Sequence, residues 1–277
     1  MTKLSHLMAK IGQVDVVSSD VFDTLLLRTL KSERSRILKG EQLFSDLLKQ
    51  QGISVVADVL ADARIRAQSL TFRALKLRRV PGEARLEEII GRQLAILGLA
   101  QSLIADRLQI EIEVEKTALA PAKSLADVLS AYRRVGARIV ASSDTTLPSD
   151  AIRQLIEHCH GQNLIDRVYS SADLGATKRH GDLFDIVAKT ECVPMERILH
   201  IGDDWLADVQ VPSSKGISAV HVSQRSYRST LRRLDGALTE ITRAARAGAR
   251  GRIRANSSVP SATEFGRAVF GPIVTQF

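Results

Sequence analysis

Carboxylates, a hydroxyl and a lysine stand in four short segments of the chain. A carboxylate at the end of a buried strand can attack a phosphoryl group, and clustered carboxylates select a hard cation such as Mg²⁺. A serine hydroxyl can hydrogen-bond a phosphoryl oxygen, and a lysine can balance the charge of nucleophile and phosphate. The set predicts phosphoryl transfer, and its members are Asp20 and Asp23 in DVFDT, Ser142, Ser143 and Asp144 in RIVASSD, Lys178 in GATKRHGDLF, and Asp203, Asp204 and Asp208 in ILHIGDDWLAD.

Each segment, taken alone, has a plain structural explanation. An aspartate after a strand is common in loops, Gly-Asp-Asp is typical of a turn, and Ser-Ser-Asp often caps a helix. A lone lysine is most often a solvated surface residue. The order, spacing and strand-end placement of the four segments together favour the chemical interpretation, because strand ends are where such sheets bind ligands.

Five short β-branched runs, separated by helical patterns, predict the strands that must position these groups. One helical pattern follows Pro148, with Ile152, Leu155 and Ile156 on one face. Strands that alternate with helices indicate an α/β fold, a doubly wound, Rossmann-like parallel sheet. The expected strands are residues 14–19, 137–142, 167–170, 198–201 and 218–222.

The interval between the first two expected strands is too long for a single crossover. It carries helical periodicity with many charges over residues 30–125, which we interpret as an inserted helical cap. Residues 1–29 and 126–224 are then the α/β core, and residues 225–277 are a basic helical extension with a tail.

The extension is rich in arginine. Leu238, Ile241 and Ala245 give part of it an apolar helical face. Residues 251–262 have the composition of a polar linker, and the apolar end FGRAVFGPIVTQF is expected to dock on the protein. The arginines of residues 225–254 favour a solvated helix face over a surface that binds nucleic acid or phospholipid, since no nucleic-acid motif accompanies them.

Composition narrows the class of partner. The net charge of +8 calls for an anionic partner, and the aromatic content of only 4% argues against the stacking platforms that bind single-stranded nucleic acid. A small phosphorylated substrate therefore competes well with nucleic acid, which we do not expect as a partner. No apolar run approaches the length of a membrane span, and no signal peptide is evident at the start. Two cysteines cannot form a disulfide framework, so we expect a cytoplasmic protein.

The sequence resembles the haloacid dehalogenase superfamily, whose members are mostly phosphatases and phosphotransferases. The resemblance covers nearly the whole chain and rests on DVFDTLLLR, SDTTLP, KRHGDLF and HIGDDWLAD. These segments are most similar to a branch whose members often accompany glycosyltransferase or capsule-synthesis domains. The resemblance implies a Rossmann-like core with a cap, hydrolase activity, Mg²⁺ as cofactor, and a glycosyltransferase or carbohydrate-synthesis protein as partner.

The resemblance also implies roles for individual residues. Asp20 matches the nucleophile that forms an aspartyl-phosphate and also binds the metal. Thr24, Ser143 and Lys178 are expected to bind the substrate, and Ser143 and Lys178 also take part in catalysis. The metal ligands implied are Asp20, the backbone carbonyl of Phe22, Asp203 and Asp208.

One position departs from the phosphatase pattern. The second catalytic acid stands two residues after the nucleophile, and here that residue is Phe22. Asp23 stands one residue further, where many relatives have glycine. Because residues three apart on a strand do not share a face, Asp23 can carry the proton only if the chain leaves strand geometry after Asp20.

Other functions therefore stay open. Dehalogenating and phosphonate-cleaving members of the superfamily also lack an acid at the position of Phe22, because their leaving groups need no such proton donor. A non-catalytic module that binds a phosphorylated ligand or a partner is a third interpretation. In the cap, RIRAQSLTFRALKLRR either attracts an anionic substrate or is a solvated helix face.

Overall fold

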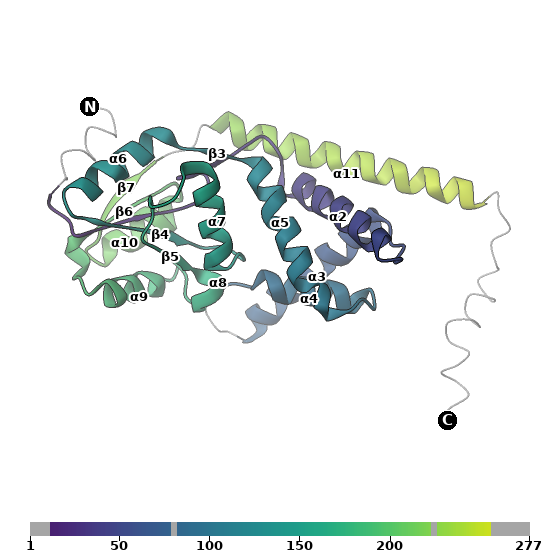
Figure 1. Cartoon of the computed structure of the whole chain (residues 1–277), viewed down its shortest axis with the longest axis horizontal. Coiled ribbons are helices and arrows are strands. Elements are labelled where there is room, and N and C mark those ends of the chain that lie inside the picture. The colour runs from purple at the N-terminus through teal and green to yellow at the C-terminus, as the bar shows by residue number, and fades with distance from the viewer. Residues whose placement is uncertain (1–11, 79–81, 223–225, 256–277) are drawn as a thin grey trace, which may run out of the picture.

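Five parallel strands form the central sheet of the computed structural model, which describes residues 12–78, 82–222 and 226–255 (Figure 1). The order across the sheet is β5-β4-β1-β6-β7, so the chain begins at the middle strand and builds outward on each side in turn. This confirms the predicted doubly wound α/β fold. The strands are β1 (Val16–Ser19), β4 (Arg138–Ser143), β5 (Arg167–Ser170), β6 (Ile198–Gly202) and β7 (Ser218–His221), each within two residues of its expected range.

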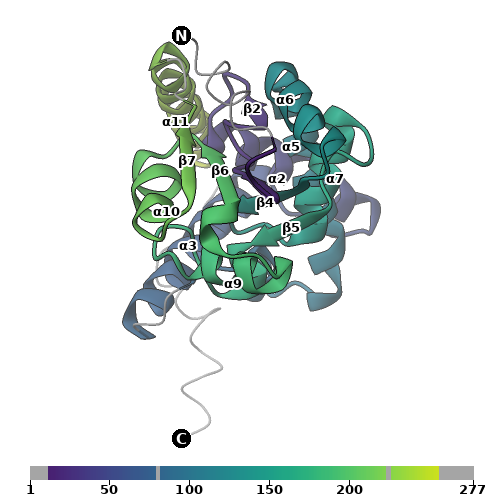
Figure 2. The same ribbon diagram turned by 90° about the vertical axis from the view of Figure 1, so that its left-hand side faces the viewer.

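Helices connect the strands and cover both faces of the sheet (Figure 2). The helices of the core are α6 (Lys123–Arg134), α7 (Ser149–His160), α8 (Ser171–Leu174), α9 (Asp182–Glu191) and α10 (Val211–Ser214). Short turns of helix lie at η2 (Met195–Arg197) and η3 (Trp205–Gln210), and η3 is a π-helix that begins directly after the Gly-Asp-Asp segment.

Alternate residues of the strands face different layers of helices, because side chains on a strand alternate between faces. Val17, Ile139 and Leu199 form one row across β4, β1 and β6 and share a core cluster with α6 and α7. Val16 and Val140 face the other way and pack in a second cluster with α9. Burial on both faces explains why these strands read as continuous apolar runs.

The cap segment joins the core through a small antiparallel pair of strands, β2 (Leu26–Arg28) and β3 (Leu119–Pro121). The chain that enters the cap and the chain that leaves it therefore lie side by side. Between them the helices are α2 (Glu33–Gln50), α3 (Ala57–Arg78), α4 (Leu86–Ile96), η1 (Gln101–Leu103) and α5 (Ile104–Ala118). The domain boundaries drawn from the sequence stay predictions.

After β7, α11 (Ser226–Ala255) runs along the cap and packs on α2 (Figure 1). The helix continues to residue 255, so the expected linker at 251–262 is wrong for its first five residues, where arginine and alanine favour helix. The apolar face of α11 is exposed, with Leu238 at 62% and Ile241 at 65%. The rest of the linker and the apolar C-terminal end lie outside the described residues. Within the described part of the chain, no helix combines the length and apolarity that crossing a bilayer requires.

Candidate active site

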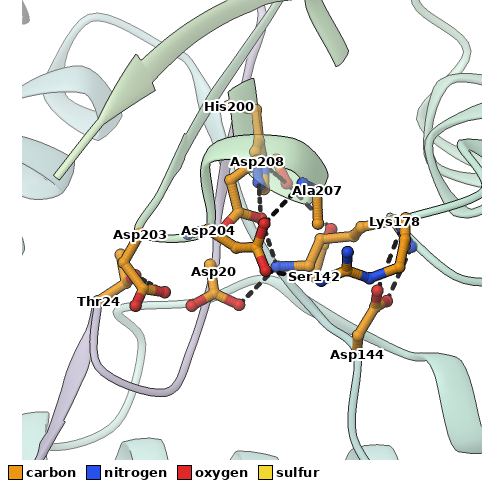
Figure 3. A network of polar contacts seen from close by, with 12 residues as sticks. Asp20, Thr24, Ser142, Asp144, Lys178, His200, Asp203, Asp204, Ala207 and Asp208 are labelled. Atoms are coloured by element: carbon orange, nitrogen blue, oxygen red, sulfur yellow. Dashed lines mark hydrogen bonds and ion pairs between the residues drawn. The ribbon is translucent and has the colours of Figure 1, made fainter. Parts of the chain in front are cut away.

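The carboxyl edge of the sheet brings together the nucleophile and the lysine expected from the sequence (Figure 3). Asp20 directly follows β1, and its backbone N–H donates to the carbonyl of Ile201 on β6 at 2.8 Å. Lys178, in the loop between α8 and α9, donates through Nζ to Oδ1 of Asp20 at 2.5 Å and to Oδ1 of Asp208 at 2.6 Å. All three side chains are buried, so these ion pairs are shielded from solvent.

Three carboxylates of this edge form a candidate metal centre. One oxygen each from Asp20, Asp203 and Asp208 lies within 4.8 Å of the other two. Oδ2 of Asp20 is buried and has no hydrogen-bond partner among the described residues. Two of these acids contact the Lys178 ammonium, and all three offer hard oxygen donors, so the residues fit a Mg²⁺ ion.

The electrostatics of the two buried acids differ. Burial raises the pKa of Asp20 to about 6, and the neighbouring Asp208 carboxylate adds to the rise while the Lys178 ammonium opposes it. Burial by itself also raises the pKa of Asp208, but the hydrogen bond from His200 and the charge of Lys178 outweigh it and hold that pKa well below its ordinary range. A cation beside Asp20 would favour its ionised, nucleophilic form.

His200 is a functional candidate that the sequence reasoning missed. Its Nε2 lies 3.0 Å from Oδ1 of Asp208, and its Nδ1 lies 2.9 Å from the hydroxyl of Ser18, which in turn contacts Ser142 at 2.9 Å. Because the carboxylate can only accept, Nε2 donates, and in the neutral ring Nδ1 accepts from Ser18. The signal was available in HIGDDWLAD, where a histidine at the centre of an apolar strand stands eight residues before Asp208.

Two further acids of the motifs position loops. The carboxylate of Asp144 accepts from the backbone N–H of Lys178 at 2.8 Å and from that of Arg179 at 3.2 Å, which fixes the lysine-bearing loop (Figure 3). The side chain of Asp204 caps η3 by accepting from the N–H groups of Leu206 and Ala207. The backbone N–H of Asp204 donates to Oδ2 of Asp208 at 2.9 Å, so this turn also holds a carboxylate of the cluster.

The expected substrate-binding hydroxyls lie beside the cluster. Ser143, at the end of β4, is buried and lines the same pocket as Asp20 and Lys178. Thr24 donates to Oδ1 of Asp203 at 3.4 Å. Thr24 therefore contacts one of the expected metal ligands, and Ser143 faces the pocket from a neighbouring strand.

Phe22 occupies the position of the usual second acid and is buried. The guanidinium of Arg28 lies over its ring, 4.3 Å from the centroid. Such a cation–π contact orients the planar guanidinium. A positive charge therefore lies against the side chain at the position where the sequence resemblance implies an acid.

Asp23 lies outside the carboxylate cluster. Its φ is +63°, in the left-handed region that favours glycine, so the chain does leave strand geometry after Asp20. Both oxygens of Asp23 accept from Nη1 of Arg232 on α11, at 2.7 and 3.0 Å, and Oδ1 also accepts from the backbone N–H of Arg28. Sequence reasoning could not single out Arg232, which is one of many arginines in α11. The role of Asp23 as proton carrier stays a prediction, and it requires the Arg232 pair to open.

Gly202 is expected to be essential for the position of Asp208. A Cβ added at Gly202 would lie 2.3 Å from both Cγ and Oδ2 of Asp208, so the carboxylate would have to move. We expect Gly202→Ala to lower turnover or Mg²⁺ affinity by about 10- to 100-fold, as mutations of groups that orient metal ligands do.

A glycine in a cap helix provides the matched control for this prediction. In Gly91→Ala the tightest contact of the new Cβ is with the flexible side-chain end of Gln101, at 3.1 Å. This variant should leave the turnover rate and the Mg²⁺ affinity unchanged. Turnover measured at a series of Mg²⁺ concentrations gives the turnover rate and the Mg²⁺ affinity. If both values are equal in Gly202→Ala and the wild type, the predicted role of Gly202 is contradicted.

Comparison with known proteins finds similar structures but no matching family model or curated protein. No protein-family model matches the chain, and no curated protein matches it. Among solved structures, a 2-haloacid dehalogenase from Pseudomonas syringae pv. tomato DC3000 is 15% identical with a TM-score of 0.52, over 74% of this chain and 84% of that one. At this identity the similarity shows the fold alone: the chain has the fold of the haloacid dehalogenase superfamily.

Two further structures are similar at lower scores. L-2-haloacid dehalogenase from Xanthobacter autotrophicus is 19% identical, with a TM-score of 0.48 over 82% of this chain and 86% of that one. A HAD family enzyme from Bacteroides thetaiotaomicron, in complex with magnesium and inorganic phosphate, is 12% identical. Its TM-score is 0.47, over 77% of this chain and 95% of that one.

Proposed function

We propose that the protein is a Mg²⁺-dependent hydrolase that removes phosphate from a small phosphorylated metabolite. One observation carries this proposal: Oδ1 of buried Asp20 is held by Lys178, Oδ2 has no hydrogen-bond partner among the described residues, and Asp20 clusters with two more carboxylates. A buried nucleophile with a free oxygen, a cation beside it and hard ligands around it suits phosphoryl transfer.

The residues divide the chemistry between them. Asp20, Asp203, Asp208 and the carbonyl of Phe22 would hold Mg²⁺, which supplies charge compensation for the phosphoryl oxygens when bound. The free oxygen of Asp20 attacks phosphorus, the bond to the leaving oxygen breaks, and an aspartyl-phosphate forms. Lys178 balances the charge of nucleophile and phosphate, and the hydroxyl of Ser143 donates to a phosphoryl oxygen. Water then attacks the phosphorus, the bond between phosphorus and the Asp20 oxygen breaks, and inorganic phosphate is released. Asp23, once released from Arg232, would give a proton to the leaving oxygen in the first step and take one from the water in the second.

The direct test is a panel of phosphorylated metabolites assayed for phosphate release. We expect the wild type to turn over at least one member with Mg²⁺ and none with EDTA, and Asp20→Asn to abolish turnover. Asp185→Asn makes the same substitution at an exposed carboxylate that pairs with Lys215, and should keep full activity. Turnover that survives Asp20→Asn, or no turnover of any member, overturns the proposal.

Dehalogenation is the second candidate. Phe22 in place of an acid favours it, because a halide leaves without a proton, and the fold is shared with a 2-haloacid dehalogenase. In this reaction Asp20 would attack carbon and expel halide. Halide release from 2-haloacids that continues in EDTA, together with no phosphate release, would select this alternative. The carboxylate cluster favours the phosphatase, because a metal-free reaction does not require three adjacent acids.

Phe22→Asp tests the missing acid directly. If protonation of the leaving group limits the reaction, the variant should hydrolyse alkyl phosphates at least about 10-fold faster relative to aryl phosphates, which leave without a proton. The ratio of the two kcat/KM values is the quantity to measure, because it does not depend on the fraction of folded enzyme. Phe22→Leu is the control, and its ratio should equal that of the wild type.

The location and the partner stay predictions. A cytoplasmic location, a phosphorylated sugar or nucleotide-sugar-related substrate, and a glycosyltransferase or carbohydrate-synthesis partner rest on sequence resemblance and composition.

A further inference from the structure

A large cavity between cap, core and α11 adjoins the catalytic pocket. The catalytic pocket has a volume of about 490 Å³, and the adjoining cavity has about 970 Å³. Both are lined by Asp23, Arg28, Glu83, Asp144 and Thr145. A leaving group bonded to a phosphate at Asp20 would therefore reach the larger cavity past these five side chains.

Most arginines that line the cavity already have an acidic partner. Arg36 pairs with Glu115 at 2.6 Å, and Arg34 with Glu240 at 3.0 Å. Arg64 binds the amide oxygen of Gln68 at 2.9 Å and lies 4.0 Å from Glu111. Arg232 holds both oxygens of Asp23, and Arg233 is exposed to solvent, which can hydrate its charge. Of these guanidiniums, only that of Arg64 has a buried Nε without a hydrogen-bond partner among the described residues, and Arg64 does not line the catalytic pocket.

Arg28 differs from these arginines because it lines the catalytic pocket as well as the larger cavity. Its closest carboxylate is Asp23, at 3.9 Å, and Asp23 is already bound by Arg232 at 2.7 Å. Its Nε is buried without a hydrogen-bond partner among the described residues, and its side chain is 29% exposed. Arg28 therefore shares its nearest carboxylate with Arg232, and its side chain lines both pockets.

The acids around Arg28 compensate its charge only in part, and none of them lies closer to the guanidinium than 3.9 Å. Burial lowers the pKa of its guanidinium, Glu115 opposes this, and the like charges of Arg36 and Arg232 lower it further. The Phe22 ring supports the Arg28 guanidinium from one side but provides no hydrogen bond.

We propose that Arg28 binds a second anionic group of the substrate, so that the leaving group itself carries a carboxylate or a further phosphate. This inference rests on the proposed function and narrows its substrate class to phosphomonoesters with an anionic leaving group. A planar guanidinium stacked on a ring matches either group through two parallel hydrogen bonds. The substitution of Phe22 for the usual acid then has a positive role, because its ring carries this arginine.

Binding measured in an Asp20→Asn background separates this inference from catalysis. Two matched pairs of ligands are titrated calorimetrically in the presence of Mg²⁺. 3-Phosphoglycerate differs from glycerol 3-phosphate by a carboxylate, and fructose 1,6-bisphosphate differs from fructose 6-phosphate by a second phosphate. The first pair tests a carboxylate as the bound group, and the second tests a phosphate.

In at least one pair, the member with the second anion should bind about 10- to 100-fold more tightly, as expected for charge-assisted hydrogen bonds. Arg28→Met, which keeps an apolar chain on Phe22, should remove this advantage, and Arg28→Lys should keep part of it. Arg34→Met, at an exposed arginine of the same cavity, is the control and should retain the whole advantage.

Equal affinities within both pairs, no binding of any ligand, or an advantage that survives Arg28→Met overturns the inference. Its failure is distinguishable from failure of the proposed function. If the wild type releases phosphate but binds both members of each pair equally, only the anion site is rejected. If an Arg28-dependent preference for the second anion is found but no compound releases phosphate, the phosphatase function is rejected and the anion site is retained.

Discussion

Lys178→Met is expected to abolish turnover and to destabilise the core. Lys178 is 3% exposed and lies between Asp20 and Asp208. Burial by itself lowers the pKa of Lys178, but the two carboxylates outweigh it and hold that pKa above its usual value. Methionine fills similar space and leaves the buried carboxylates without their cation. Removing one partner of a buried ion pair costs about 3–5 kcal/mol, and loss of a charge that stabilises the transition state lowers kcat by about 10²- to 10³-fold.

The measurements for this prediction are phosphate release and the urea dependence of circular dichroism. Lys215→Met is the control, because Lys215 pairs with Asp185 at the surface and should change the free energy of unfolding by about 0.5 kcal/mol or less. Mg²⁺ should stabilise Lys178→Met more than the wild type, since the variant has one positive charge fewer among the same acids. A loss of stability no larger than that of Lys215→Met would contradict the structure of the site.

Arg107→Met is expected to have the largest effect on the cap. Arg107 and Glu41 are both fully buried and bond through Nη2 and Oε1 at 2.8 Å, and Nη1 of Arg107 lies 2.8 Å from Glu111. Gln93 donates to the other oxygen of Glu41 at 2.9 Å. The variant leaves Glu41 as an unpaired acid among the cap helices, and we expect it to lower the free energy of unfolding by about 3–5 kcal/mol.

A second substitution should reverse much of this loss. In Arg107→Met with Glu41→Met, the charge and its partner are removed together, and replacing a buried pair by apolar residues is often neutral. Arg133→Met is the control, because its pair with Asp166 is about one-third exposed on each side. Urea unfolding followed by circular dichroism measures all three variants. Failure of the double variant to recover stability would show that the Arg107 network does more than neutralise Glu41.

The sequence by itself determined the fold class, the five strands of the sheet, and the edge at which the chemistry lies. The reason is that strand and helix periodicity are local, and that parallel strands end on one side. Asp20, Lys178, Asp203 and Asp208 could therefore be placed near one another from strand ends alone, and they do meet there. The departure at Phe22 was also readable, because it concerns a spacing of two residues.

The tertiary structure alone decided which distant groups satisfy one another. Arg232 reaches Asp23 across 209 residues, and Arg107 reaches Glu41 across 66. No local pattern marks one arginine among many for such a pairing. His200 looked like part of an apolar strand until the fold placed it against Asp208 and Ser18. The partly uncompensated charge of Arg28 follows from the same fact: charge compensation depends on which side chains meet in space, and the order of residues along the chain does not specify this.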